Sequence, residues 1–505
     1  MNLKKHSQFL LYLFGSLLLR FWNFQNSLYF IYDQGRDAWV FDKIAHGHPV
    51  LVGPTSGLSG FCLGPLWYYI GLPGYILSRG NPYGICLWYI AISCLALPLY
   101  WILAHKLFKE KIWAILTAIF LSVLPGSLVA SSMIWNPLLS VPLMLGALIC
   151  LWQAHVATSR NRTWLAAGFL CLALTLQSEF AYGIFFIIPL FLAIPWLRKK
   201  FNVRDFIVVI AVIGVTLLPQ MGFELRNHFI MTQSLLKSTA SSETSVSWKL
   251  QLAQRPTQLL EATNHVLVGD NNRTPYLLPL LIILAIIGGY VILKDRTLKN
   301  SFLWQLVLIF AVLPYPFYLL WRGNNGYFFW YYLTCHFVFL VPLIFLGCWK
   351  VMELAAKKNW HKIIAAAFVL FIVLNFTAQA WQNWYDTAVH ATGNANLHKM
   401  IEAVETVNTW HKDDGSQPFV VRIYTANILT EQYDYLFYWY ARSRGLSIPS
   451  TVRNAENHTW YVFIEVSSRS EKSLFDQWYA EATLGGHLIK QEKIGDFQLE
   501  KWQKE

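Results

Sequence analysis

Clusters of lysine and arginine interrupt this chain of 505 residues at every second gap between its apolar segments. The clusters are Lys4/Lys5, Lys106/Lys109/Lys111, Arg160/Arg162, Arg198/Lys199/Lys200/Arg204, Lys294/Arg296/Lys299 and Lys350/Lys357/Lys358/Lys362. The short gaps between them carry almost no basic residue, with Arg322 as the exception. Short loops on the cytoplasmic side of a membrane retain lysine and arginine, so the alternation assigns a side to each gap. It predicts a polytopic membrane protein with an inner N-terminus and an outer C-terminus.

The composition agrees with this prediction, because 55% of the residues are hydrophobic and 13% are charged. Soluble domains average about 25% charged residues. In a soluble protein the net charge of +12 would indicate nucleic-acid binding. Here most of the excess lies in predicted cytoplasmic loops, where it sets topology and meets anionic lipid headgroups, so a nucleic-acid partner is excluded. The seven cysteines form no CxxC pair, and neither a disulfide framework nor a zinc site is expected.

Apolar segments of about twenty residues predict membrane-spanning helices. About eleven spans are expected, at residues 9–24, 84–104, 112–131, 137–154, 164–176, 183–196, 206–221, 276–293, 302–321, 329–348 and 363–380. The first has no small-residue cleavage site at its end and is a retained span rather than a signal peptide. Residues 66–78 are apolar but number only about thirteen, which predicts a juxtamembrane or re-entrant helix.

The sequence predicts two domains, a transmembrane domain at residues 1–381 and an extracytoplasmic domain at 382–505. Two outer loops, about 25–83 and 222–275, interrupt the first domain, and residues 33–46 form an amphipathic helix in the first loop. In the second domain, apolar strands alternate with helices, which predicts a small α/β fold. The expected helices are 398–410, 431–442 and 470–481, and the expected strands are 419–425 and 460–466.

Carboxylates at the outer ends of the spans are the first candidates for chemistry. Asp33 follows the first span directly, and Asp37 lies one helical turn later, so the two can share a face. Either could take a proton from an acceptor hydroxyl or amine, or the pair could simply favour a helix N-terminus. Glu179 lies between two apolar runs, where a carboxylate must pair, protonate or face water.

Several cations near the same side could hold a phosphate. Glu224, Arg226 and His228 close the predicted span 206–221, and guanidinium matches phosphate oxygens in bidentate fashion. The other phosphate candidates are Arg20, Arg36 and Arg322. Each position also has a structural explanation, as a polar helix end or as an arginine anchored at the membrane interface. No nucleotide-binding glycine motif is present, and Cys335-His336 has no further metal ligands at useful spacing.

Three short motifs follow one another in the first predicted outer loop. Asp33-Gln34-Gly35-Arg36 stands where an Asp-Glu-x-Arg motif would, Ala45-His46-Gly47 ends the following helix, and Leu63-Gly64-Pro65-Leu66-Trp67-Tyr68-Tyr69 approximates Pro-Pro-Leu-x-Tyr. With the predicted topology, this layout resembles the GT-C membrane glycosyltransferases, in particular bacterial aminoarabinose transferases and protein O-mannosyltransferases. The resemblance covers roughly residues 1–225.

Three departures from the family pattern affect the expected site. Gln34 replaces the second acid, Leu63/Gly64 replaces a basic residue that can bind the lipid phosphate, and Trp135-Asn136-Pro137 stands where relatives often have an aspartate. No cofactor is therefore assigned, and a divalent metal lacks a clear ligand set. Phosphate binding shifts to the cations named above.

The resemblance implies an inverting glycosyltransferase of the inner membrane. It would move a sugar from a polyprenyl-phosphate donor to a glycan, lipid or protein acceptor on the outer face, with Asp33 as the base. A lipid-linked saccharide flippase or transporter is an alternative, although it should carry polar residues deep within several spans. A polymerase or ligase of lipid-linked glycans is another, with its chemistry in the second outer loop.

Overall fold

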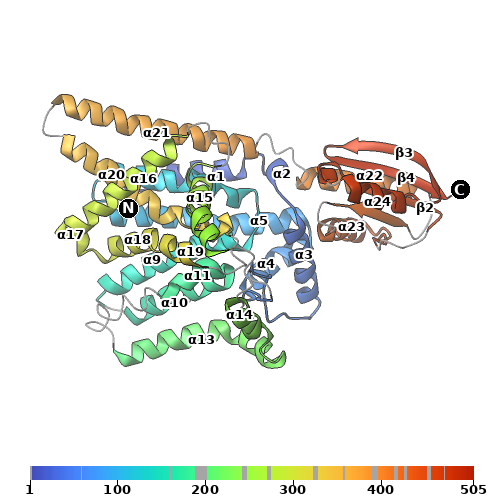
Figure 1. The fold of residues 1–505 in the computed structure, drawn as a ribbon, viewed down its shortest axis with the longest axis horizontal. Helices are drawn as coiled ribbons and strands as arrows, with labels where there is room; N and C mark the ends of the chain where they lie inside the picture. Colours follow the sequence, from blue (N-terminus) through green and yellow to red (C-terminus); the bar gives the residue numbers. More distant parts are fainter. Residues whose placement is uncertain are drawn as a thin grey trace.

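The computed structural model describes residues 3–57, 60–158, 161–187, 202–240, 247–269, 275–321, 328–355, 359–388, 396–414, 419–425, 429–451, 457–470 and 472–504. Over these ranges the chain forms a helical bundle that continues, at one end, into a small α/β domain (Figure 1). The all-α transmembrane class with a C-terminal α/β part is confirmed.

Among the described residues, seven helical segments are long and apolar enough to cross a membrane. They are α5–α6 (Pro82–Ser93, Ala96–Leu107), η2–α9 (Asn136–Leu139, Ser140–Val156), α13 (Val203–Arg226), α16 (Leu277–Lys294), α18–α19 (Phe302–Val312, Pro314–Leu320), α20 (Phe337–Ala355) and α21 (Asn359–Ala388). The shorter helices α1 (Leu3–Phe21) and α7 (Lys111–Val123) are also apolar. The predicted span 164–176 lies within α10 (Asn161–Ser178), whereas most of 183–196 falls outside the described residues. The number of spans stays a prediction.

Three basic connections lie together at one end of the bundle over their described residues. The indole of Trp349, near the end of α20, donates a hydrogen bond to Glu110 before α7 at 2.9 Å. One cavity is lined jointly by Lys109, Trp349 and Leu298 of α17 (Arg296–Lys299). Figure 1 places α17 at the end of the bundle opposite α3, α4 and the C-terminal domain. Three of the basic connections therefore share one end of the bundle, as the alternation predicts, and which end faces the cytoplasm stays a prediction.

The first predicted loop contains the helices α2 (Phe24–Ser27), α3 (Tyr32–Ala45) and α4 (Leu66–Ser78). Helix α4 has the bounds expected from the sequence, and its 13 residues extend about 20 Å, less than the roughly 30 Å of a bilayer core. It packs on α3 through rings of Phe41 and Tyr68, whose centroids lie 6.1 Å apart. The loop is thus a folded cap at one end of the bundle.

The second predicted outer loop is mostly helical in its described part. It forms α14 (Ile230–Ala240) and α15 (Trp248–Leu267). Helix α15 buries a face that recurs every three or four residues, and this face is formed by Gln251, Arg255, Leu259, Ala262 and Val266. The sequence of α15 is polar on average, so its apolar positions were not recognised as one face. This buried face makes α15 part of the bundle.

A correction concerns the predicted span 329–348, since α20 begins only at Phe337. The preceding residues form a 3₁₀ turn, η5 (Trp330–Leu333). Its rings find partners on different helices: Trp330 lies 3.9 Å from the His265 ring, and Tyr332 stacks on Tyr318 at 6.0 Å. These contacts hold the segment out of a regular helix.

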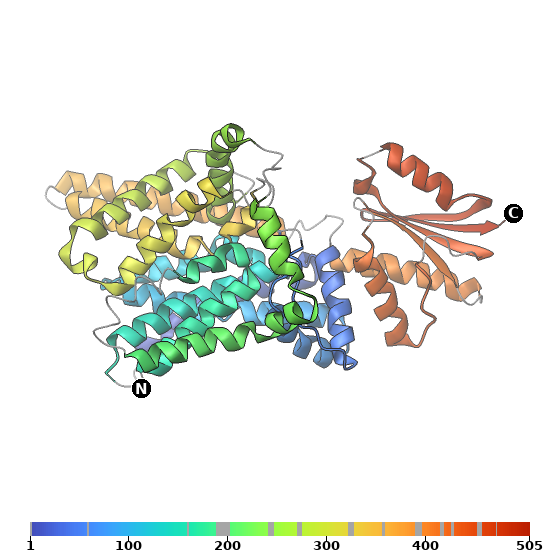
Figure 2. The ribbon, with the colours of Figure 1, turned by 60° about the horizontal axis from the view of Figure 1, so that its bottom comes forward.

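The C-terminal domain contains a four-stranded sheet of order β1-β2-β4-β3. Its elements are α22 (Leu397–Asp414), β1 (Val420–Tyr424), α23 (Glu431–Arg444), β2 (Thr459–Glu465), α24 (Lys472–Ala482), β3 (Gly486–Ile494) and β4 (Phe497–Lys504). Strands β1 and β2 are parallel, with Val421 opposite Tyr461. Helices α22 and α23 cover one face and α24 the other (Figure 2). The five predicted elements are confirmed, and the β3–β4 hairpin was not predicted.

Helix α23 packs directly against α3. A Cβ added at Gly35 of α3 would lie 2.4 Å from the backbone of Gln432, so the glycine permits this close approach. Trp39 of α3 contacts the ring of Tyr438 at 4.7 Å, and the Tyr435 hydroxyl donates to the Gly80 carbonyl at 2.5 Å. The C-terminal domain thereby holds the helix that carries Asp33.

Candidate functional site

The acidic motif of the sequence lies in the first two turns of α3, bridged by an arginine. Arg36 Nη1 lies 2.8 Å from Asp33 Oδ1, and its Nη2 lies 2.7 Å from Asp37 Oδ1. The Asp33 side chain is 29% exposed, whereas that of Asp37 is 6% exposed. Asp33 can therefore meet a ligand while Asp37 fixes the arginine between them.

Asp37 is anchored on its other side by α4. The Trp67 indole donates to Asp37 Oδ2 at 2.6 Å, and Trp67 stacks on Tyr89 at 4.1 Å. Burial raises the pKa of Asp37 to about 6, although the Arg36 charge and the Trp67 hydrogen bond act in the opposite direction. These contacts make Asp37 a positioning residue for the motif.

Glu179 caps α11 (Phe180–Gly183), where its Oε1 accepts a hydrogen bond from the Ala181 N–H at 3.0 Å. The residue is 5% exposed. Burial raises the pKa of Glu179 to about 8, against the effect of the Ala181 bond. In the described part of the chain, no cation forms an ion pair with it. Burial therefore favours the neutral form of Glu179.

Tyrosines of η5 connect the two acidic positions. Burial, the neighbouring Tyr332, and the charges of Glu179 and Asp33 all raise the pKa of Tyr331. Both carboxylates therefore lie within electrostatic range of this phenol. A Cβ at Gly57 of the first loop would lie 2.6 Å from the Tyr332 hydroxyl and 3.1 Å from that of Tyr331. The structure thus brings α3, α11, η5 and the first loop into one site.

Arg255 is a buried cation that the sequence analysis missed. It is 1% exposed on α15, its guanidinium lies 5.3 Å from the Phe328 ring, and its Nη2 donates to the Trp321 carbonyl at 3.4 Å. Burial lowers the pKa of Arg255, and the nearby Tyr332 opposes that shift. The spacing along the helix could have indicated this burial, because Arg255 lies four residues before Leu259 on the buried face of α15.

The phosphate candidates named from the sequence are dispersed. Glu224 caps α14, accepting hydrogen bonds from Met231 N–H at 2.9 Å and Thr232 N–H at 3.0 Å. Arg226 and His228 are exposed at the α13–α14 turn. None of these three has a recorded contact with Asp33, Arg36 or Glu179 in the described ranges.

Arg20 is buried at 3% exposure rather than anchored at the membrane surface. It donates to Ser122 O at 2.9 Å and Ser127 Oγ at 2.8 Å. Arg322 lies outside the described residues. Within the described ranges, no three His, Cys, Asp or Glu side chains come together as a metal site.

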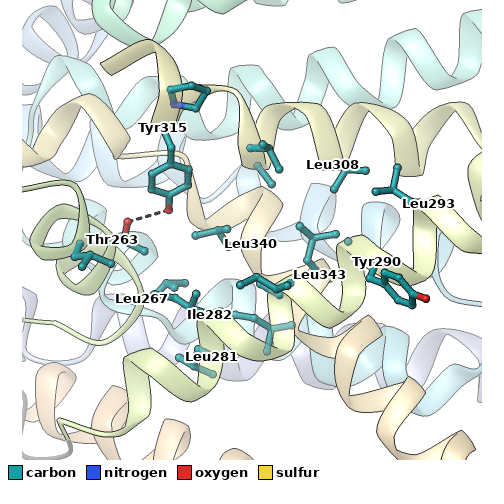
Figure 3. A pocket seen from close by; sticks show the side chains of 18 residues that line it. Thr263, Leu267, Leu281, Ile282, Tyr290, Leu293, Leu308, Tyr315, Leu340 and Leu343 are labelled. Carbon is teal, nitrogen blue, oxygen red and sulfur yellow. Dashed lines mark hydrogen bonds between the residues drawn. The ribbon is translucent and has the colours of Figure 1, made fainter. Parts of the chain in front are cut away.

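An apolar cavity of about 580 Å³ lies beside this site, lined by α15, α16, α18, α19 and α20. At one end, Thr263 and Tyr315 share a hydrogen bond of 2.9 Å, and at the other end lies Tyr290 (Figure 3). Tyr315 is one turn from Tyr318, which stacks on Tyr332. The cavity therefore approaches the tyrosines of η5 through α19.

No family model matches the sequence, and no curated protein sequence matches it. Two crystal structures of ArnT from Cupriavidus metallidurans share the fold. The apo structure has a TM-score of 0.56 at 12% identity, covering 97% of this chain and 97% of that chain. The structure bound to undecaprenyl phosphate has a TM-score of 0.61 at 11% identity, covering 98% of each chain. At this identity the likeness shows the fold, and it confirms the expected GT-C architecture, since ArnT is a GT-C aminoarabinose transferase.

Proposed function

We propose that this protein is a membrane glycosyltransferase that moves a sugar from a polyprenyl-phosphate donor to an acceptor. The observation that carries the proposal is Asp33, a partly exposed carboxylate held by Arg36, whose charge acts, with that of Glu179, on the phenol of Tyr331. The fold is that of ArnT, which binds undecaprenyl phosphate. A ligand of that kind needs both a polar site for its head and an apolar site for its tail.

Asp33 is the general base of the proposed reaction. It accepts the proton of the acceptor hydroxyl or amine, which forms a bond to the anomeric carbon. The bond from that carbon to the phosphate oxygen breaks, and the polyprenyl phosphate leaves with the electron pair. A single displacement of this kind inverts the anomeric configuration. Arg36 orients Asp33 through their ion pair of 2.8 Å.

Arg255 is the cation best placed for the leaving phosphate. It is buried beside Tyr332, where a charge-assisted hydrogen bond is stronger than in water. The hydroxyls of Tyr331 and Tyr332 add neutral donors, since burial keeps the Tyr331 phenol protonated. Exposed Arg226 and His228 are secondary candidates for headgroup contact at the rim.

Part of the lipid tail fits the 580 Å³ cavity, whose lining is almost entirely apolar (Figure 3). Its end at Tyr315 lies one helical turn from Tyr318 and thus close to the polar cluster. We place the reaction on the outer face, because the basic connections gather at the opposite end of the bundle.

The test uses purified full-length protein in detergent, with synthetic polyprenyl-phosphate sugars labelled in the sugar and envelope extract as the acceptor source. Transfer of label with release of polyprenyl phosphate supports the proposal. Reconstitution in vesicles provides the contrast, since a flippase would move the intact donor between leaflets without breaking the glycosidic bond. Movement without cleavage for every donor would replace the transferase by a transporter.

A further inference from the structure

A second cavity, of about 370 Å³, is separate from the apolar one and has a different lining. It lies between α8 (Pro125–Leu128), η1 (Val129–Ser131), the end of α15, η5 and the end of α21. Its polar and aromatic lining comes from Tyr29, Ser132, His265, Trp330, Asn383 and Asp386. We call it the Trp330 pocket.

The lining of the Trp330 pocket has the chemistry of a sugar-binding site. Trp330 offers a rigid apolar ring with a polar edge, held against the His265 ring at 3.9 Å. Asp386 and Asn383 supply carboxylate and amide groups for hydroxyls, and Asp386 already accepts from the Gln382 amide at 2.8 Å. Among the described residues that line it, Asp386 carries the only charge and no lysine or arginine is present, which favours neutral or amine-bearing rings over phosphates.

Close backbone packing and side-chain hydrogen bonds join α15 to α21 beside the pocket. Gly269 has a φ of +93°, and a Cβ there would lie 2.5 Å from the Asn383 amide nitrogen. The Asn383 amide in turn donates to the Val268 carbonyl at 2.6 Å, and the Asn264 amide donates to the Gly269 carbonyl at 3.0 Å. Glycine at position 269 thus allows α15 and α21 to meet beside the pocket.

The pocket shares a wall with the acidic site. Trp330 precedes Tyr331, the phenol whose pKa the charges of Glu179 and Asp33 raise. The ring of Trp135 contacts both, at 5.7 Å from Trp330 and 4.7 Å from Tyr331. A saccharide in the pocket would therefore lie one aromatic residue away from the proposed reaction centre.

We infer that the Trp330 pocket binds a pyranose ring of a neutral or amine-bearing saccharide, stacked on Trp330 and hydrogen-bonded by Asn383 and Asp386. This inference rests on the proposed function for its role. The ring belongs either to the donor sugar or to a saccharide acceptor, and the chemistry of the pocket is the same for both.

The test measures binding without transfer, by saturation-transfer NMR on the full chain with glucose, glucosamine and N-acetylglucosamine as probes. Signals from ring protons are expected with the native protein, weakened roughly tenfold or more in Trp330→Leu. Trp360→Leu is the matched control, because Trp360 lies exposed near the other end of α21. Asp386→Asn should weaken glucosamine more than glucose. Equal signals in the native protein and Trp330→Leu, with both folded by circular dichroism, would overturn the inference.

Competition then separates the two sources of the ring. Displacement of the probe by a polyprenyl-phosphate sugar, but not by bare polyprenyl phosphate, assigns the pocket to the donor sugar. Retention of the probe with saturating donor assigns it to a saccharide acceptor. Probe binding needs no turnover, so the two proposals can fail separately. A protein that binds sugar at Trp330 but transfers none would contradict the proposed function and still support the sugar-binding pocket.

Discussion

The guanidinium of Arg442, in the C-terminal domain, lies 3.2 Å from Oδ1 of Asp42 on α3. The same carboxylate accepts hydrogen bonds from the hydroxyls of Tyr75 at 2.5 Å and Tyr438 at 3.3 Å. Helix α3 therefore carries Asp33 at its first turn and is held near its end by the domain. An exposed ion pair contributes only about 0–1 kcal/mol, so the packing of α23 on α3 is the larger part of this contact.

That packing predicts the effect of Gly35→Ala. The added Cβ would meet the Gln432 backbone at 2.4 Å and force α3 away from α23. Overpacking of this kind costs about 1–3 kcal/mol, and we expect a lower unfolding temperature and a large loss of transfer. Gly214→Ala is the control, since a Cβ there meets nothing within 4 Å. Equal stability and activity of the two variants would show that the domain does not position α3.

Glu179 predicts a pH dependence of stability. Its pKa is raised from 4.5 to about 8, so the folded state favours the neutral acid. Stability from this group is fully present below about pH 4.5 and is lost as pH rises through about 8. The unfolding temperature, measured from pH 5 to 9, should fall with rising pH in the native protein. The Glu179→Gln variant should lack this fall. Parallel curves for the two proteins would place the pKa of Glu179 near its ordinary value.

Arg255 predicts a loss of phosphate binding. Hydrogen bonds to charged groups contribute about 1.5–3 kcal/mol, so Arg255→Ala should weaken polyprenyl-phosphate binding roughly ten- to a hundredfold. Arg255→Lys should recover part of the loss, because lysine keeps the charge without the planar fork. Arg226→Ala, at the exposed α13–α14 turn, should have the smaller effect. A larger effect at Arg226 would place the phosphate site at the α13–α14 turn, as the sequence alone predicted.

The topology predicts opposite accessibility of the two ends. In a background without the seven native cysteines, a cysteine replacing Lys109 should react only after the membrane is permeabilised. A cysteine replacing exposed Lys490 of the C-terminal domain should react from outside intact cells. If both sites react from the same side, the assignment of the basic connections to the cytoplasm is wrong.

Local patterns in the sequence were sufficient for several parts of the fold. Helix α4 has the predicted bounds, because its short apolar run and the adjacent charges define it without distant contacts. The strands β1 and β2 have apolar runs that are typical of buried strands, and both were predicted. Strand β3 was missed because most of its residues are exposed and polar, and it is held through pairing with β4.

The site was predicted only in part, for a related reason. Asp33, Asp37 and Arg36 are close in sequence, so their spacing on one helix was sufficient to group them. Tyr331 comes within electrostatic range of Asp33 from a segment far along the chain, and Arg255 lies near the adjacent Tyr332; only packing brings them there. Arg20 was named as a candidate phosphate ligand because it lies near the end of an apolar segment. In the structure its guanidinium is buried in the bundle and donates hydrogen bonds to Ser122 and Ser127.

The central claim is that Asp33 is the base, and the turnover of Asp33→Asn tests it most directly. Asparagine keeps the shape and loses the basicity, and removal of a positioned base costs about a hundred- to ten-thousandfold in rate. We measure sugar transfer from a synthetic polyprenyl-phosphate donor together with donor binding, and Asp37→Asn serves as the comparison. The account predicts nearly abolished transfer in Asp33→Asn with donor binding retained, and a smaller loss in Asp37→Asn. Near-normal turnover of Asp33→Asn would contradict it.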